Sequence, residues 1–252
     1  MHEFSELGLV ILFFVIATLY SSAGFGGGSS YIALLSLTAF PVPEIRLIAL
    51  ICNIGVVSIN TWSNVKHKLL PLKRALKISL FSIPFAFIGG SISLNLSSFT
   101  YILGFSLLII SGIMLAQILN KLENFKLPKI DNFILSGSIG LLSGLIGIGG
   151  GIFLSPLLFL SNWGKAKQIA ATASLFILLN SLSGLCGLLY TNWSYFSDNF
   201  KHENLAVYLL LSVILGSLLG QQTNRLQGAN QRIKGLTAIL LFVVSIRLII
   251  NG

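Results

Sequence analysis

The chain has 252 residues and a formal net charge of +9, and 54% of its residues are hydrophobic whereas only 9% are charged. This balance excludes an ordinary soluble globular domain. Runs without a charged residue, such as 7–43 and 132–164, exceed the length of about 20 residues that one membrane-spanning helix needs. Since the alternation of apolar and polar residues typical of a membrane β-barrel is missing, the sequence predicts an all-α polytopic membrane protein.

The first apolar run, "LVILFFVIATLYSSAG", ends in small residues as a signal peptide does. However, Glu3 and Glu6 precede it, where a signal peptide carries basic residues. We therefore expect this run to be the first membrane helix. Breaks between the apolar runs predict ten helical segments in chain order: 5–24, 28–40, 45–63, 76–93, 98–119, 132–148, 151–160, 168–190, 205–222 and 236–250.

Two of these segments, 28–40 and 151–160, are short for a bilayer. As a helix the first would be about 20 Å long, against a hydrocarbon core of about 30 Å. Each follows three consecutive glycines, in "GFGGGSS" and "GIGGGIF". Because helix propensity opposes three glycines in a row, we expect a broken or re-entrant backbone at both places and about eight full spans elsewhere. Close helix packing is the alternative role of such glycines.

Charge predicts the orientation of the bundle. The connections 64–77, 120–131, 161–167 and 223–235 hold 13 of the 16 basic residues, while five of the seven acidic residues lie in the other connections and at the N-terminus. By the positive-inside rule these four connections are cytoplasmic and both termini are outside. Orientation and a lipid-facing surface account for the basic charge without any nucleic acid.

The sequence also predicts an inverted repeat. An offset of 123 residues aligns glycines 26–28 with glycines 149–151, and small residues upstream of the two motifs coincide as well. Each half has five segments, an odd number, so the halves 1–125 and 126–252 enter the membrane from opposite sides. Inverted repeats with short, glycine-interrupted segments in matching positions are typical of secondary transporters whose substrate binds at the repeat interface.

The two backbone breaks are the predicted substrate site. The freed amides at the starts of the two short segments carry partial positive charge, which suits an anion. Hydroxyl and amide side chains of the neighbouring segments add hydrogen-bond donors. The predicted substrate-binding residues are Gly24, Gly26, Gly27, Gly28, Ser29, Asn53, Gly147, Gly149, Gly150, Gly151, Thr172, Ser174 and Asn180.

Two segments carry a stripe of polar residues seven positions apart, a spacing that places them on nearly one helix face. The stripes consist of Arg46, Asn53 and Asn60 and of Lys167, Ser174 and Ser181. We interpret Arg46 and Lys167 as the mouths of an anion pathway on opposite sides of the membrane. The alternative is that both basic residues are interfacial anchors and that the polar residues hold helices together.

The membrane segments lack the residues of several other functions. Every Asp and Glu lies in a connection or near the end of a segment, so neither a metal-cation site nor a carboxylate proton relay is expected. The stretch "HENLA" at His202 departs from the HExxH zinc motif at its fifth residue, and no serine-nucleophile motif is present. We therefore expect no metal, no cofactor and no enzymatic activity.

The motifs "SGLIGIGGGIFLSPLL" and "SSAGFGGGSSYIALL", with "KAKQIAATASLF" after the first of them, resemble the sulfite exporter TauE/SafE family, also called the toluene sulfonate uptake permeases. The resemblance covers nearly the whole chain. It implies a small transporter with two repeated halves that moves sulfite, sulfonates or related sulfur compounds. It also supports the motif glycines, Lys167, Thr172 and Ser174 as site residues, whereas the first half departs from the family pattern at "RLIALICN".

The combined prediction is a secondary transporter of a small anion that works by alternating access at a midplane site. Sulfite or an organosulfonate is the favoured substrate, and a bacterial inner membrane is the expected location. Two alternatives stay open, a transporter of another small organic anion and a non-transporting membrane scaffold subunit. The expected partners are the anion and the lipid bilayer, and the sequence is compatible with a homo-oligomer.

Overall fold

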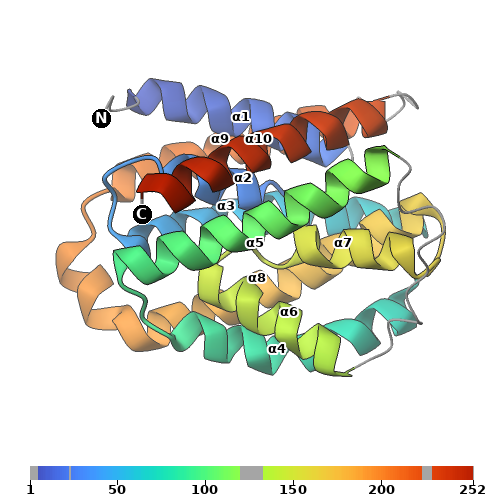
Figure 1. The fold of residues 1–252 in the computed structure, drawn as a ribbon, viewed down its shortest axis with the longest axis horizontal. Coiled ribbons are helices and arrows are strands. Elements are labelled where there is room, and N and C mark those ends of the chain that lie inside the picture. The colour runs from blue at the N-terminus through green and yellow to red at the C-terminus, as the bar shows by residue number, and fades with distance from the viewer. Residues whose placement is uncertain (1–4, 23, 120–132, 223–228, 252) are drawn as a thin grey trace.

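A computed structural model of the chain describes residues 5–22, 24–119, 133–222 and 229–251. Within these ranges the chain forms helices and no strands, as the all-α prediction requires (Figure 1). The helices are α1 (Glu6–Ser22), α2 (Gly28–Leu35), α3 (Val42–Lys66), α4 (Leu72–Ser91), α5 (Leu96–Ile118), α6 (Phe133–Ile146), α7 (Gly151–Leu160), α8 (Ala166–Asn199), α9 (Glu203–Gln222) and α10 (Ala229–Asn251).

Four of the described helices, α3, α5, α8 and α9, are long and apolar enough to cross a membrane. Local sequence explains where several of them begin or bend. α3 has Pro43 in its first turn, where a missing N–H costs no helical hydrogen bond. α5 follows Asn95, whose side chain accepts a hydrogen bond from the amide of Ser98 at 2.8 Å. α8 departs from helical geometry at Asn192, where φ is −115° and ψ is 23°.

Some boundaries differ from the sequence prediction. The first short helix ends at Leu35 instead of 40, and residues 36–41 form a connection. The hydroxyl of Thr38 donates to the carbonyl of Leu35 at 2.6 Å, which closes the end of the helix. The basic connection predicted at 64–77 narrows to 67–71, because α3 and α4 extend into it. The predicted connection 120–131 lies outside the described residues, and so do residues 223–228 of the predicted connection 223–235. Residues 229–235 belong to α10.

The helices pack in defined pairs around a buried centre. α1 packs against α9, α4 against α6 and α8, α5 against α10, and α3 against α8 and α9. In Figure 1, α1 and α9 lie toward one edge of the bundle and α4 and α6 along the opposite edge. Every residue of α2, from Gly28 to Leu35, is buried. The backbone break before α2 therefore lies inside the bundle.

The connections divide between the two ends of the bundle. The beginning of α1 and the end of α10 lie at one end, together with the connections 36–41, 92–95 and 200–202 (Figure 1). The connections 67–71 and 161–165 lie at the other end. The exposed basic residues beside these two connections therefore gather at the end of the bundle opposite the beginning of α1 and the end of α10.

Candidate functional site

Both short helices begin at a glycine-containing backbone break, as the sequence predicts. α2 starts at Gly28, with Gly27 as the preceding cap residue, and α7 starts at Gly151, preceded by Gly150. These four glycines are buried. Neither helix has a side chain that caps its first amides, so the start of each helix presents bare backbone.

The two breaks differ in backbone conformation. Gly147, Gly149 and Gly150 have φ values of +91°, +81° and +82°, which glycine adopts without steric cost. In the first break Gly24 has a φ of +78°, whereas Gly27 has a φ of −91°. The left-handed backbone conformation therefore favours glycine at position 150. At position 27 the backbone angles are open to any residue, so a need for glycine there would come from close contacts with neighbouring atoms.

The two breaks meet at Asn53 of α3. Its amide nitrogen Nδ2 donates to the carbonyl of Ile148 at 3.0 Å and to the hydroxyl of Ser181 at 3.1 Å. A Cβ atom added at Gly28 would lie 2.6 Å from the Ile148 oxygen and 2.8 Å from Asn53 Nδ2, and one added at Gly149 would lie 2.6 Å from the same nitrogen. The glycines of both breaks thus leave the space that Asn53 occupies.

The polar stripes of α3 and α8 also hold the first break. Ser174 donates to the carbonyl of Gly24 at 2.6 Å, and Asn60 donates through Nδ2 to the carbonyl of Phe25 at 3.0 Å. The Oδ1 atom of Asn60 accepts from Ser21 of α1 at 2.7 Å. Side chains predicted to line a pathway therefore satisfy the carbonyl groups of the broken backbone.

The backbone amide groups of the breaks differ from the carbonyl groups in their hydrogen bonding. No described hydrogen bond is donated by the backbone amides of residues 26–28 or 149–151. The first amides of a helix have no acceptor within it, and they lie at the positive end of its dipole. The candidate site therefore combines satisfied carbonyls with unsatisfied backbone donors, an arrangement that favours an anion.

Two further hydroxyl groups border the breaks. Among the described residues, Tyr31 Oη and Ser143 Oγ are buried without a hydrogen-bond partner, as is Asn53 Oδ1. A Cβ atom added at Gly27 would lie 2.7 Å from Tyr31 Oη, and one at Gly150 would lie 3.1 Å from Ser143 Cβ. The sequence prediction missed Tyr31 and Ser143. Their helical spacing of four residues from a motif glycine, Tyr31 after Gly27 and Ser143 before Gly147, was the available signal.

The remaining predicted residues are buried but less clearly connected to the breaks. Ser29 is buried in α2, and Thr172 Oγ1 has no partner among the described residues. Asn180 donates through Nδ2 to the carbonyl of Phe176 at 3.0 Å, and its Oδ1 has no partner there. No described hydrogen bond joins these three side chains to either break. Their assignment to the site stays a prediction.

Arg46 is buried, with an exposed fraction of 1%. Its guanidinium group donates to the carbonyls of Ile92, Gly89 and Gly90 at 2.9, 3.2 and 2.9 Å, and so satisfies the end of α4. A fourth bond, of 3.0 Å, reaches the carbonyl of Gly144 in α6. Arg46 therefore ties α3 to two other helices, and a role at an open mouth would require these bonds to break.

The two predicted mouth residues differ in environment. Arg46 has no carboxylate partner among the described residues, and its backbone lies close to the second break, where a Cβ atom added at Gly147 would be 3.4 Å from Arg46 Cα. A buried guanidinium without a counter-ion favours negative charge nearby. Lys167 is exposed in the first turn of α8. The role of each residue in a pathway stays a prediction.

Comparisons with known proteins identify the family of this chain. The family model for the sulfite exporter TauE/SafE matches residues 9–248. The probable membrane transporter protein y4hK of Sinorhizobium fredii is 29% identical over 96% of this chain and 98% of its own length. The probable membrane transporter protein MJ0441 of Methanocaldococcus jannaschii is 29% identical over 86% of this chain and 85% of its own length.

A third relative, the probable membrane transporter protein YunE of Bacillus subtilis, is 25% identical over 97% of both chains. No solved structure matches. The family model and the relatives all extend over most of the chain, and the region matched by the family model contains both glycine motifs. The chain is therefore an integral membrane protein that belongs to the sulfite exporter TauE/SafE family of membrane transporters.

Proposed function

We propose that this chain is a secondary transporter of a small anion, with sulfite or an organosulfonate as the favoured substrate. The anion binds between the two glycine breaks, to the backbone amides of residues 26–28 and 149–151. Tyr31 and Ser143 add hydroxyl donors. The family supports this substrate class through its description as sulfite exporters.

The observation that carries the proposal is the contrast between the backbone groups of the breaks. Carbonyls of Gly24, Phe25 and Ile148 accept hydrogen bonds from side chains of α3 and α8, while the neighbouring amides donate to no described acceptor. In a buried place, unsatisfied donors are costly unless a ligand or water accepts from them. An anion accepts from several of these amides at once, and Arg46 adds positive charge nearby.

The proposal includes alternating access by two inverted halves. The packed helix pairs follow such a symmetry. If α1–α5 correspond in order to α6–α10, the α1–α9 pair corresponds to the α6–α4 pair, and the α2–α3 pair corresponds to the α7–α8 pair. The α3–α8 and α5–α10 pairs convert into themselves. Such a pairing supports a two-fold relation through the interface at which Asn53 and Ser181 meet.

The proposal also places the chain in a bacterial inner membrane with both termini outside. Its support is the segregation of charge, since the exposed basic residues next to 67–71 and 161–165 lie at the end opposite the start of α1 (Figure 1). Basic connections face the cytoplasm in most membrane proteins.

Flux measurements on purified protein in liposomes test the proposed function. We expect uptake of labelled sulfite above the level of empty liposomes, with competition by thiosulfate and sulfoacetate and weaker competition by simple carboxylates. Flux of a carboxylate alone would favour a transporter of another organic anion. Absence of flux for every anion, with correctly folded protein, would contradict the proposal and favour a scaffold subunit.

A further inference from the structure

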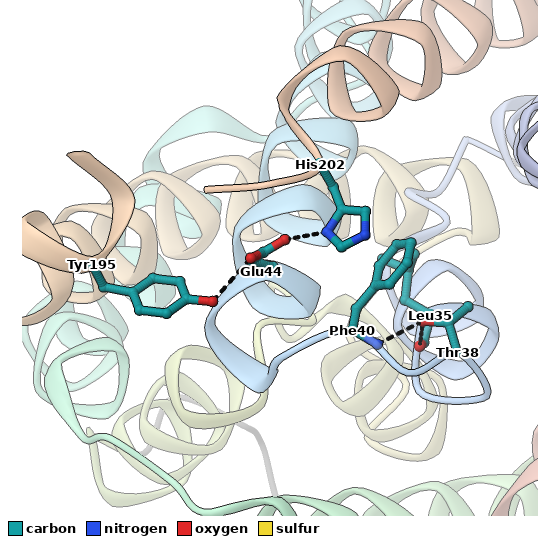
Figure 2. Close-up of polar contacts among 6 residues, drawn as sticks. All are labelled: Leu35, Thr38, Phe40, Glu44, Tyr195 and His202. Atoms are coloured by element: carbon teal, nitrogen blue, oxygen red, sulfur yellow. Dashed lines mark hydrogen bonds and ion pairs between the residues drawn. The ribbon is translucent and has the colours of Figure 1, made fainter. Parts of the chain in front are cut away.

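A second polar cluster lies at the end of the bundle where the connections 36–41 and 200–202 meet (Figure 2). Glu44, in the first turn of α3, has a side chain that is 0% exposed. The hydroxyl of Tyr195 donates to its Oε1 at 2.9 Å, and the ring nitrogen Nδ1 of His202 is hydrogen-bonded to its Oε2. We call Glu44, Tyr195, His202 and Phe40 the Glu44 cluster.

Phe40 links the cluster to the connection that leaves α2. Its ring stacks on the imidazole of His202, with ring centroids 3.8 Å apart and an angle of 30° between the planes. Its amide lies 3.4 Å from the hydroxyl of Thr38, which in turn donates to the end of α2 (Figure 2). The cluster therefore joins α3 and the α2–α3 connection to the α8–α9 region.

We propose that His202 and Glu44 form a proton-binding site that regulates anion transport, because the proton binds and leaves at this one end of the bundle. This inference rests on the proposed function and adds its regulation by pH. Since Glu44 Oε2 accepts from Nδ1, the proton of a neutral His202 lies on Nδ1, and a further proton binds at Nε2. The side chain of His202 is 27% exposed, so water reaches the imidazole although the carboxylate is buried.

Proton binding strengthens both contacts of His202. An imidazolium converts the hydrogen bond to Glu44 into a charge-assisted ion pair in a buried place. It also places a cation against the face of Phe40. The protonated site therefore holds the first half against the α8–α9 connection at this end, and loss of the proton weakens the closure.

Among the described residues, Tyr195 is the one other titratable group that is hydrogen-bonded to Glu44 or His202. Residues 36–41 contain no titratable group, and the guanidinium of Arg46 on α3 donates to the carbonyls of α4 and α6. On α8, Asp198 is exposed, and so are Lys201 and Glu203 beside His202. Within the described part of the chain, His202 and Glu44 form the one ion pair. Tyr195 serves as a neutral donor to the carboxylate.

The site is connected to the glycine breaks through α3. Glu44 lies in the first turn of this helix, and Asn53, which touches both breaks, lies further along it. Phe40 lies in the connection that follows α2, the helix that begins at the first break. A movement that opens the Glu44 cluster therefore displaces the two elements that form the first half of the anion site.

A double-mutant cycle tests the proton site without any substrate. Thermal stability of Glu44→Gln, His202→Gln and the double variant is measured at about pH 5.5 and about pH 8, which bracket the charge change typical of histidine. We expect each single variant to lower Tm more at the acidic pH, by about 3 °C or more, and the double variant to lose no more than either single one. Asp198→Asn, at an exposed carboxylate near the end of α8 and four residues before His202, is the matched control and should leave Tm unchanged at both pH values. An equal loss at both pH values, or additive losses, would overturn the proton site.

Flux in liposomes tests the regulation by pH. Methanesulfonate is the probe, because its charge does not change across this pH range and any pH effect then belongs to the protein. We expect flux of the unmodified protein and of Asp198→Asn to be lower at about pH 5.5 than at about pH 8 on both sides of the membrane, because the protonated pair holds this end of the bundle closed. Glu44→Gln and His202→Gln should lose this pH dependence. The same pH dependence in both variants would overturn the regulatory role. Absence of any anion flux in the unmodified protein would contradict the proposed function instead, and the stability cycle would still decide whether the pair binds a proton.

Discussion

Asn53 Nδ2 lies 3.0 Å from the carbonyl oxygen of Ile148, so a side chain of α3 holds the backbone break that precedes α7. The same nitrogen lies 3.1 Å from Ser181 Oγ of α8. The side-chain amide of Asn53 thus connects α3 and α8 to the second break. Gly26 and Gly28 of the first break lie against the same side chain. A substitution of Asn53 should therefore affect both breaks.

We expect Asn53→Asp to reduce anion flux more than Asn53→Ala. Both changes remove the donor to Ile148 and leave a buried carbonyl unsatisfied, at a cost of about 1–3 kcal/mol in the free energy of unfolding. Aspartate also places negative charge beside the amides that bind the anion. Flux per folded molecule is the measurement, and Asn95→Asp, at an exposed helix cap, is the control. Equal flux in the two Asn53 variants would show that no anion approaches this side chain.

Arg46 and Lys167 should respond differently to salt. Arg46→Gln removes donors to several buried carbonyls, and we expect it to lower stability by on the order of 3 kcal/mol. Because this charge is buried, its effect on flux should be similar at low and high salt. Lys167→Gln should reduce flux at low salt, with a smaller effect at high salt, since screening weakens attraction by an exposed charge. If Lys167→Gln lowered the flux equally at low and high salt, or did not lower it at all, Lys167 would be an interfacial anchor.

The predicted orientation can be measured with single cysteines. In a Cys186→Ser background the remaining Cys52 is buried, so an introduced cysteine is the reactive thiol. We expect Asp198→Cys to react with a membrane-impermeant maleimide in intact cells, and Lys68→Cys to react only after the membrane is opened. The two positions lie beside connections at opposite ends of the bundle (Figure 1). Labelling of both from the same side would contradict the orientation and the inverted-repeat proposal.

Much of the architecture is predictable from composition and glycine placement. The all-helical class follows from apolar runs with few charges, and it is confirmed together with the family. Both short helices begin at the predicted glycines, because three adjacent glycines disfavour a continuous helix. The inverted repeat and the substrate site stay predictions.

The partners of buried polar side chains are not predictable in the same way. Helical spacing places Arg46 and Asn53 on one face, but it does not reveal which carbonyls lie opposite them. The acceptors of Arg46 belong to the end of α4 and to α6, and they are brought together only by packing. For the same reason Glu44 reads in the sequence as a residue near the end of a segment, whereas the structure buries it against Tyr195 and His202.

The most direct test of the account compares Gly150→Ala with Gly140→Ala. Gly150 has a φ of +82°, and a Cβ atom there would lie 2.9 Å from Phe176 and 3.1 Å from Ser143, so a methyl group disturbs the break itself. Gly140 lies where α6 packs on α4, and its Cβ atom would meet the backbone carbonyl of Ser82. The measurement is sulfite flux and affinity per folded molecule, with Tm followed for both variants. We predict that Gly150→Ala loses most of its flux per folded molecule, whereas Gly140→Ala loses stability but keeps the flux of the molecules that remain folded. Unchanged flux and affinity per folded molecule in Gly150→Ala would contradict the claim that the glycine breaks bind the anion.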